Sequence, residues 1–338
     1  MAAKHPAESW LKVTADGLYC APGDFFIDPV RPKPCAVVTH GHADHARPGN
    51  DRVLATPGTA AIMRARYGDQ AGRRLETAEY GERLKLGDVT VWFAPAGHVL
   101  GSAQAVLEYH GTRVVVSGDY KRREDPTCAA FQPVQADVFI TEATFGLPVF
   151  HHPPVGHEID KLLASMARFP ERTHLVGAYA LGKCQRVIAE LRRAGYDRPI
   201  WIHGALKALC ALYQREGIAL GPLEDATAAA KADLVGELVL APPSALKDRW
   251  SRRLADPVTA MASGWMGVRQ RAKQRLVELP LIISDHADWD ELTRTVQDVA
   301  AGTVWVTHGR EEALVHWATT QGFDAKALSL VGFEEEAE

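Results

Sequence analysis

A short run of histidines and one carboxylate is the segment of this sequence most suited to chemistry. His40-Gly-His42-Ala-Asp44-His45 places four potential metal ligands within six residues, with small residues between them. It directly follows the β-branched run CAVVT at 35–39, so we expect it to form a loop at the end of a buried strand. Imidazole nitrogens and carboxylate oxygens suit zinc, and a ligand set without cysteine is typical of catalytic zinc sites.

Three further polar side chains also stand where strands are expected to end. His98 follows VTVWFAPA, Asp119 follows VVVSG, and His308 follows TVWV. Each alone would be read as a loop cap. Open α/β sheets, however, gather their functional groups at one edge of the strands. We therefore expect these three side chains to converge with the histidine-rich loop.

The number of candidate ligands predicts two metal ions rather than one. The seven candidates are His40, His42, Asp44, His45, His98, Asp119 and His308. They are too many for one tetrahedral zinc, whereas a bridging Asp119 would give each of two ions four protein donors. Two ions about 3.5–4 Å apart can acidify and aim a hydroxide and stabilise the charge that develops at a phosphodiester. We expect two Zn²⁺, with Mn²⁺ as the alternative metal.

The pattern of strands and helices divides the chain into three segments. Residues 1–149 alternate short β-branched runs with Gly- and Pro-rich turns, including a hairpin that turns at His110-Gly111. The turn-forming run FGLPVFHHPP at 145–154 marks a break, and residues 150–278 then alternate helical and strand patterns, which is typical of a parallel α/β unit. From residue 279 the first pattern resumes. We predict an α/β sandwich made of 1–149 and 279–338, with an α/β domain inserted at 150–278.

The composition is that of an ordinary soluble globular protein. Of the 338 residues, 46% are hydrophobic and 24% charged, and no stretch approaches the length of a membrane span. Five scattered cysteines without a CxxC pair argue against a disulfide framework and fit a cytoplasmic location. The formal charge is −4, yet residues 151–280 hold 19 basic and 13 acidic residues, an excess of 19 − 13 = +6. This excess fits either a polyanionic partner or a plain basic surface.

Six short motifs follow one another in a fixed order along the chain. They are HGHADH at 40–45, GHVLGS at 97–102, SGD at 117–119, TEATFG at 141–146, SDHAD at 284–288 and VTHG at 306–309. In this order they resemble the β-CASP branch of metallo-β-lactamase-fold nucleases. The resemblance extends into the insertion, through AYALGKCQ at 178–185 and PIWIH at 199–203. It implies a metallo-β-lactamase αββα sandwich with an inserted α/β β-CASP domain, and the compact insertion is most similar to bacterial DNA-ligase-associated exonucleases.

The resemblance also implies a role for each candidate residue. One zinc would be held by His40, His42, His98 and Asp119, and the other by Asp44, His45, Asp119 and His308. Asp28, after the run FFI, would orient the metal loop, although it could equally be a strand-end cap. Glu142 and His286 would act with the catalytic carboxylates Asp44 and Asp119, His286 protonating the departing oxygen while Glu142 fixes its tautomer. His286 could instead cap the helix expected to start near residue 288.

Five residues are candidates for binding the substrate. The basic run Lys121-Arg122-Arg123 directly follows SGD and could contact phosphates beside the scissile bond, or form a solvated turn. Lys183 opens an expected helix, where backbone amides and its ammonium group could hold a phosphate together. Trp265 could stack on a base, or belong to the core.

The resemblance favours a metal-dependent DNA exonuclease that hydrolyses phosphodiester bonds in DNA repair or end processing. DNA would be its main partner, and a functional association with a DNA ligase and a helicase is expected. The alternative is an RNA-processing nuclease of the same family, since a histidine at the position of His308 is typical of RNA-processing members. A thioester hydrolase would share HGHADH but leave the insertion unexplained, and an inactive nucleic-acid-binding scaffold would have no need of a complete ligand set.

Overall fold

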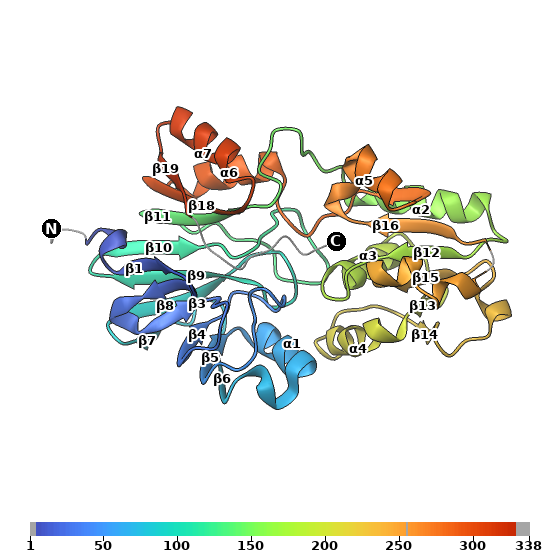
Figure 1. Cartoon of the computed structure of the whole chain (residues 1–338), viewed down its shortest axis with the longest axis horizontal. Helices are drawn as coiled ribbons and strands as arrows, with labels where there is room; N and C mark the ends of the chain where they lie inside the picture. The colour runs from blue at the N-terminus through green and yellow to red at the C-terminus, as the bar shows by residue number, and fades with distance from the viewer. Residues whose placement is uncertain (1–4, 255, 329–338) are drawn as a thin grey trace. The chain divides into compact units, whose positions relative to one another are not determined.

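The computed structural model describes residues 5–254 and 256–328. It contains two compact units (Figure 1). The first unit comprises the chain up to His151 and from His286 onward, and the inserted unit comprises His152–Asp285. None of the described helices has the length and apolar character that a membrane span requires.

Two mixed sheets form the centre of the first unit. The strands of one are β1 (Leu11–Thr14), β2 (Gly17–Cys20), β3 (Phe25–Ile27), β4 (Cys35–Val37), β5 (Arg52–Ala55) and β6 (Arg74–Thr77). The strands of the other are β7 (Leu84–Leu86), β8 (Val89–Pro95), β9 (Ala103–Tyr109), β10 (Thr112–Val116), β11 (Val138–Ala143), β18 (Thr303–Gly309) and β19 (Asp324–Ala327). The orders are β1-β2-β3-β4-β5-β6 and β19-β18-β11-β10-β9-β8-β7. The expected hairpin at His110-Gly111 is confirmed, because β9 pairs antiparallel with β10 around it.

Helices cover the outer faces of both sheets, as Figure 1 shows. They are α1 (Pro57–Tyr67), α6 (Trp289–Val299) and α7 (Glu311–Thr320). One buried cluster joins the two sheets, with Phe25 from the first and Phe93 from the second. Met63 of α1 packs in a cluster with the first sheet, and Leu292 of α6 packs in a cluster with the second. The layers are therefore helix, sheet, sheet, helix, which confirms the predicted αββα sandwich.

The inserted unit is built around one six-stranded sheet. Its strands are β12 (His174–Gly177), β13 (Ile200–Ile202), β14 (Leu223–Asp225), β15 (Leu238–Ala241), β16 (Val258–Ala262) and β17 (Leu279–Leu281), and its α-helices are α2 (Val155–Arg168), α3 (Lys183–Arg193), α4 (Lys207–Arg215) and α5 (Arg269–Gln274). The order is β14-β13-β15-β12-β16-β17, and every neighbouring pair is parallel. The strands β12 and β15 are buried along their whole length and, apart from His174, contain no polar side chain, as is typical of the centre of a parallel sheet.

The return from the insertion to the first unit lies later than the sequence predicts. We expected it at residue 279, but Leu279–Leu281 forms β17 and pairs parallel with β16 of the inserted sheet. The first unit resumes at His286. A short apolar run has the same pattern whichever sheet it joins, so its neighbour cannot be read from its sequence.

Candidate metal centre

The histidine-rich loop begins just beyond β4 and is fixed by the carboxylate of Asp28, which follows β3. Asp28 Oδ1 accepts a hydrogen bond from the Thr39 backbone N–H at 2.8 Å, and Oδ2 accepts one from the Thr39 hydroxyl at 2.5 Å. The same Oδ2 lies 2.8 Å from His45 Nδ1. Asp28 therefore ties the start of the loop to its end.

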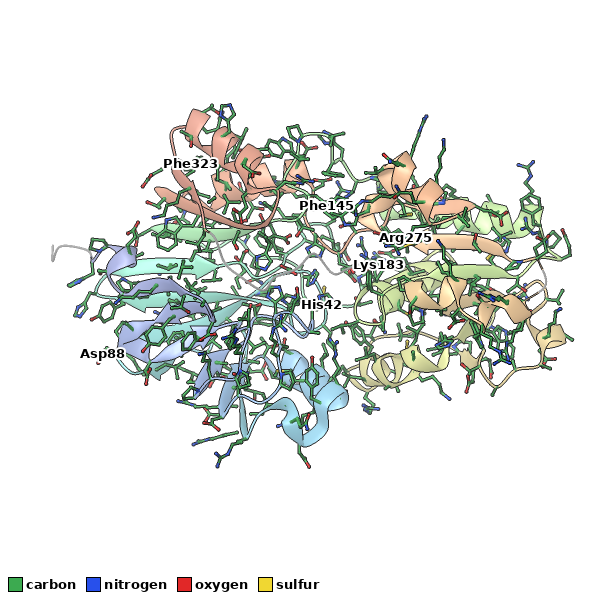
Figure 2. The ribbon with its side chains drawn as sticks, viewed as in Figure 1. His42, Asp88, Phe145, Lys183, Arg275 and Phe323 are labelled. Carbon is green, nitrogen blue, oxygen red and sulfur yellow. The ribbon has the colours of Figure 1, made fainter. Side chains whose placement is uncertain are left out.

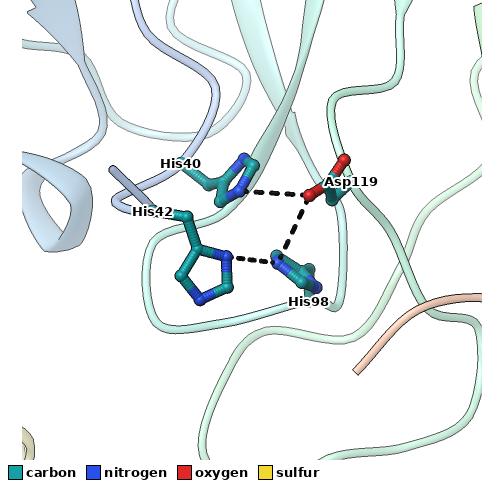
Figure 3. Close-up of side chains that lie close together, drawn as sticks. All are labelled: His40, His42, His98 and Asp119. Atoms are coloured by element: carbon teal, nitrogen blue, oxygen red, sulfur yellow. Dashed lines mark hydrogen bonds and ion pairs between the residues drawn. The ribbon is translucent and has the colours of Figure 1, made fainter. Parts of the chain in front are cut away.

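Four side chains meet in the first of three compact groups, which Figure 3 shows. The group consists of His40, His42, His98 and Asp119, each offering one atom within 4.8 Å of all the others. Asp119 Oδ2 lies 3.4 Å from His40 Nε2 and 3.8 Å from His98 Nε2. His98 Nε2 lies 3.0 Å from His42 Nδ1. All four residues are buried.

A second group shares Asp119 with the first. It consists of His45, Asp119 and His308, again with one atom of each within 4.8 Å of the others. His45 Nε2 lies 3.5 Å from Asp119 Oδ2 and 3.6 Å from Asp44 Oδ2, so Asp44 lies beside the group. The His45 and His308 rings are stacked, with centroids 5.1 Å apart. All seven candidate ligands thus gather around one carboxylate.

The third group joins the same carboxylate to the expected acid–imidazole pair. Asp119, Glu142 and His286 each offer one atom within 4.8 Å of the others. His286 Nδ1 lies 3.0 Å from Glu142 Oε2. Glu142 is buried; its Oε1 accepts a hydrogen bond from the Tyr120 backbone N–H at 2.7 Å, and its Oε2 accepts one from the Thr144 hydroxyl at 2.5 Å.

Unusual backbone conformations bring these side chains together. His308 has a φ of 60°, in the left-handed region that residues other than glycine rarely adopt. It lies where the pairing of β11 with β18 shifts register. Gly118, just before Asp119, has a φ of 54°, and a Cβ there would lie 2.7 Å from Thr39 Oγ1. Glycine thus lets the Asp119 loop pack against the start of the histidine-rich loop.

Burial keeps three of the imidazoles neutral. It lowers the pKa of His40 and of His308 to about 4 each, and it lowers the pKa of His98 as well. A neutral imidazole has the free nitrogen lone pair that a metal ion needs. These three side chains are therefore in the protonation state of a ligand at neutral pH.

His45 differs because carboxylates surround it. Burial opposes its charged form, but Asp119, Asp44 and Asp28 outweigh burial and raise the pKa of His45 to about 10. For Asp119, burial favours the protonated acid, but His45 and His40 outweigh it and lower the pKa of that carboxyl. When no metal is bound, the positive charge next to these carboxylates is that of protonated His45.

Two buried atoms show that the residues fit a divalent cation. Asp119 Oδ1 and His40 Nε2 are buried, and neither makes a hydrogen bond with any residue in the described part of the chain. Leaving such groups without a hydrogen bond costs about 1–3 kcal/mol each. A cation coordinated by histidine nitrogen and aspartate oxygen would satisfy both atoms.

The basic run after Asp119 is not a set of open phosphate contacts. Each of its side chains is held in an ion pair: Lys121 with Asp125 at 2.5 Å, Arg122 with Asp298 at 2.6 Å, and Arg123 with Asp288 at 2.5 Å. The Lys121 and Asp125 side chains are each only 2% exposed, so Lys121 is neither an open phosphate contact nor part of a solvated turn. The partners of both arginines come from near or within α6, far away in sequence.

The two candidates in the inserted unit differ from each other. Lys183, labelled in Figure 2, opens α3 as expected, but it is buried with its Nζ 3.1 Å from Asp285 Oδ2. Trp265 is buried, and the Arg271 guanidinium lies 3.8 Å from its ring centroid. Its ring is therefore no open platform for a base, which corrects that expectation in favour of the core reading.

Thr39 also belongs to the candidate site, although its sequence pattern does not predict it. Its hydroxyl donates to Asp28 Oδ2 and also lies 3.1 Å from His40 Nδ1, so it links the carboxylate to the first ligand. The sequence feature that could have identified Thr39 is its position between the strand and His40. Hydroxyls at such positions are common, however, and the partner Asp28 lies eleven residues away.

Comparison with known proteins gives three informative relatives, while no protein-family model matches the chain. A probable DNA ligase from Opitutus terrae is 30% identical over 328 residues, covering 94% of this chain and 31% of that protein. Cleavage and polyadenylation specificity factor subunit 3 of Dictyostelium discoideum is 32% identical over 36% of this chain and 16% of that protein. Endoribonuclease YSH1 of Saccharomyces cerevisiae is 32% identical over 34% of this chain and 15% of that protein. The chain thus spans about a third or less of the length of these relatives.

The fold also has a counterpart among solved structures. A crystal structure of a protein of unknown function from Enterococcus faecalis superposes with a TM-score of 0.54 at 12% identity, covering 80% of this chain and 74% of that chain. The motif order, the αββα sandwich and the sequence relatives agree with one another. Together they show that the chain belongs to the β-CASP family of metallo-β-lactamase-fold nucleases and is related to the ligase-associated members.

Proposed function

We propose that this chain is a metal-dependent exonuclease that hydrolyses phosphodiester bonds of DNA in repair or end processing. The observation that carries the proposal is the position of Asp119, which is common to two histidine groups and to the Glu142–His286 pair. DNA is favoured because the relative that aligns with 94% of the chain is named a probable DNA ligase.

We propose two Zn²⁺ ions, with Mn²⁺ as the alternative. One would be held by the first group (His40, His42, His98 and Asp119) and the other by the second group together with Asp44 (Asp44, His45, Asp119 and His308). Bound there, divalent ions supply Lewis acidity to a phosphodiester and lower the pKa of a water nucleophile.

The residues of the chain would position the ligands and move the proton. Asp28 and Thr39 hold His45 and His40 in place, which orients two ligands before any metal binds. Asp119 combines buried negative charge with contacts to both histidine groups, so it would hold the two ions together.

His286 would be the general acid. Glu142 has its Oε1 engaged by a backbone N–H, and its Oε2 faces His286 Nδ1. A carboxylate that accepts a hydrogen bond from Nδ1–H stabilises the imidazolium form of the ring. The proton on Nε2 can then pass to the oxygen that departs when the P–O bond breaks.

An RNA-processing nuclease with the same residues is the second candidate. It is favoured by the names of two relatives, an endoribonuclease and a cleavage and polyadenylation factor subunit, each of which matches about a third of the chain. His308 also favours it, since a histidine at that position resembles the RNA-processing members.

A panel of end-labelled substrates tests the proposal. Single-stranded DNA, double-stranded DNA and RNA of the same sequence would be incubated with zinc- or manganese-loaded protein, and Asp119→Ala would serve as the inactive control. We expect successive removal of nucleotides from DNA, faster than from RNA. Faster cleavage of RNA would select the second candidate, and no metal-dependent cleavage of any substrate would refute both.

We also propose a functional association with a DNA ligase, because a protein named as a ligase contains a region that aligns with most of this chain. Pretreatment of mismatched DNA ends with this protein should raise the yield of a subsequent ligation. A yield equal to that with Asp119→Ala would argue against the association.

A further inference from the structure

The positive charge of the inserted unit is concentrated in one stretch of chain. Residues 151–280 hold 19 basic and 13 acidic residues. Within them, residues 243–275 hold eight basic and two acidic residues, so their excess is 8 − 2 = +6. The remainder has 19 − 8 = 11 basic and 13 − 2 = 11 acidic residues, and is therefore neutral. The whole excess belongs to 243–275.

The helical parts of this stretch pack against one face of the parallel sheet. It contains the short helices η6 (Pro243–Lys247) and η7 (Ser251–Arg253), then β16, then α5. Leu246 packs both in the cluster that holds Trp250 and in the cluster that holds Ala272 of α5. Lys247 Nζ also donates a hydrogen bond to the Gln274 carbonyl at 3.3 Å. The two ends of the stretch therefore meet over the same face.

Five cations of this stretch are exposed, and we name them the basic face: Lys247, Arg249, Arg252, Arg269 and Lys273. None of them forms an ion pair with a carboxylate in the described part of the chain. Most cations elsewhere in the unit are paired, such as Lys207 with Asp225 at 2.9 Å. Arg168, Arg215 and Lys231, outside the stretch, also form no ion pair with a described residue. Asp248, within the stretch, caps the following turn by accepting the backbone N–H groups of residues 250 and 251.

Aromatic rings hold two more guanidinium groups in this stretch. Arg271 lies over Trp265, 3.8 Å from the ring centroid, and Arg253 lies over Trp250 at 5.3 Å. Arg275, labelled in Figure 2, caps the end of α5. Contacts with aromatic faces restrict arginine side chains without neutralising them. The positive field of the stretch is therefore partly fixed in position.

We propose that the basic face binds the sugar–phosphate backbone of the nucleic acid substrate, without reading its sequence. Neighbouring cations without acidic partners repel one another, and a polyanion removes that repulsion while releasing its own counterions. The proposal rests on the proposed nuclease function for the identity of the polyanion. It assigns to these residues the role that the ion-paired run at 121–123 does not fill.

The salt dependence of binding tests the proposal. Arg249, Arg269 and Lys273 would be changed to Ala together in an Asp119→Ala background, so that the substrate is bound but not cut. The matched control changes three exposed cations of the same unit outside the stretch, Arg168, Arg215 and Lys231, and loses the same charge. Affinity for a fluorescent single-stranded DNA of about 30 nucleotides would be measured between about 50 and 200 mM salt.

We expect the slope of log K against log[salt] to become shallower by about 2 in the basic-face variant, since each single-strand phosphate contact contributes about 0.7. The control should keep the parental slope. Equal slopes and affinities in the two variants would overturn the proposal. The proposal would also be overturned if poly-glutamate of the same charge displaced the fluorescent DNA as well as unlabelled DNA does. The basic face would then be a binding surface for acidic proteins.

A second measurement separates this proposal from the nuclease function. With Asp119 restored, hydrolysis of the small diester bis(p-nitrophenyl) phosphate should proceed at the wild-type rate in the basic-face variant, while KM for the long DNA rises. Loss of hydrolysis of the small diester in this variant, but not in the control, would contradict a role in backbone binding alone. If even the wild type cleaves no diester, the nuclease function fails, and the salt slopes still decide whether the face binds nucleic acid.

Discussion

Asp119 is the residue on which the three groups of the centre converge. Its carboxylate is buried and lies within reach of the histidine ligands, and it shares a third group with Glu142 and His286. Around it, His40 is neutral and His45 is charged, although both are buried. The difference follows from their neighbours, since Asp28 and Asp44 add negative charge on the side of His45.

The role of His286 is tested by His286→Ala. We expect hydrolysis to slow by roughly 10²–10⁴-fold, as for loss of a general acid, because His286 is placed outside the proposed ligand sets. Metal content should be unchanged, and His316→Ala, an exposed histidine of α7, should behave as wild type. Turnover that stays at the wild-type rate with saturating substrate would remove His286 from the mechanism.

The positioning role of Asp28 is tested by Asp28→Asn. The amide keeps the shape of the side chain but loses the charge that orients Thr39 and His45. We expect metal affinity, measured by titration calorimetry, to fall by roughly 10–100-fold. Thr39→Val should show a smaller loss, because the backbone contact remains. Affinities within about twofold of wild type would contradict the role.

The charge on His45 predicts a pH dependence of metal binding. Its pKa of about 10 in the metal-free protein means that it is protonated at neutral pH, and a metal ion must displace that proton. The protonated fraction of His45 falls as pH rises toward 10. The affinity of the site for the ion that His45 would bind should therefore increase with pH over this range. Calorimetry in buffers of different ionisation enthalpy should detect about one proton released at that site. Release of no proton would contradict the assignment.

At the scale of elements, the loops converge because their backbones permit close approach. Asp28 and His308, which both contact His45, have φ values of 42° and 60°. Left-handed residues other than glycine cost free energy, and such strain clusters at functional sites. Gly118 allows the loop after β10 to contact Thr39.

The close approach at Gly118 is tested by Gly118→Ala. A Cβ would lie 2.7 Å from Thr39 Oγ1 in a residue with a φ of 54°, so we expect the free energy of unfolding to drop by on the order of 1–3 kcal/mol. Gly156→Ala is the matched control, because it lies in α2 with nothing within 4 Å of the added Cβ. That change should be neutral or stabilising. Equal free energies of unfolding for the two variants would show that the Asp119 loop can move away from Thr39 without loss of stability.

Much of the fold was predictable from the sequence because periodicity and turn residues are local signals. The strands before His40, His98 and Asp119 and the helix beginning after Asp288 all lie where the pattern places them. The strand at 279–281 was assigned to the wrong sheet, because pairing depends on a neighbour that the local pattern does not specify.

The candidate site was predictable in its ligands and less so in its surroundings. Histidines and carboxylates at predicted strand ends can be identified directly from the sequence. Ion pairs such as Arg123 with Asp288 join residues far apart in the chain. The sequence therefore does not show that the side chains of a basic run already have acidic partners. The left-handed conformation of His308 and the burial of Trp265 are likewise consequences of tertiary packing.

At the scale of the whole molecule, the candidate metal ligands and the exposed cations of the basic face belong to different units. All seven candidate ligands lie in the first unit, together with Glu142 and His286, and the unpaired cations of the basic face lie in the inserted unit. Because the inserted unit contributes none of these residues, metal binding should stabilise the first unit selectively.

Metal removal tests this division. A ligand at about 100 times its Kd stabilises the folded state that binds it by about 2.7 kcal/mol per site. Chelation should therefore increase amide hydrogen exchange in β4, β10 and β18 of the first unit and leave β12 and β15 unchanged. A uniform increase across both units would contradict the division.

The most direct test of the account measures metal content and phosphodiester cleavage together in wild type, Asp119→Asn and Asp88→Asn. Asp88 is an exposed control, labelled in Figure 2. We expect two divalent ions per chain and cleavage of DNA in wild type and in Asp88→Asn, with both properties lost in Asp119→Asn. Two bound ions and undiminished cleavage in Asp119→Asn would contradict it.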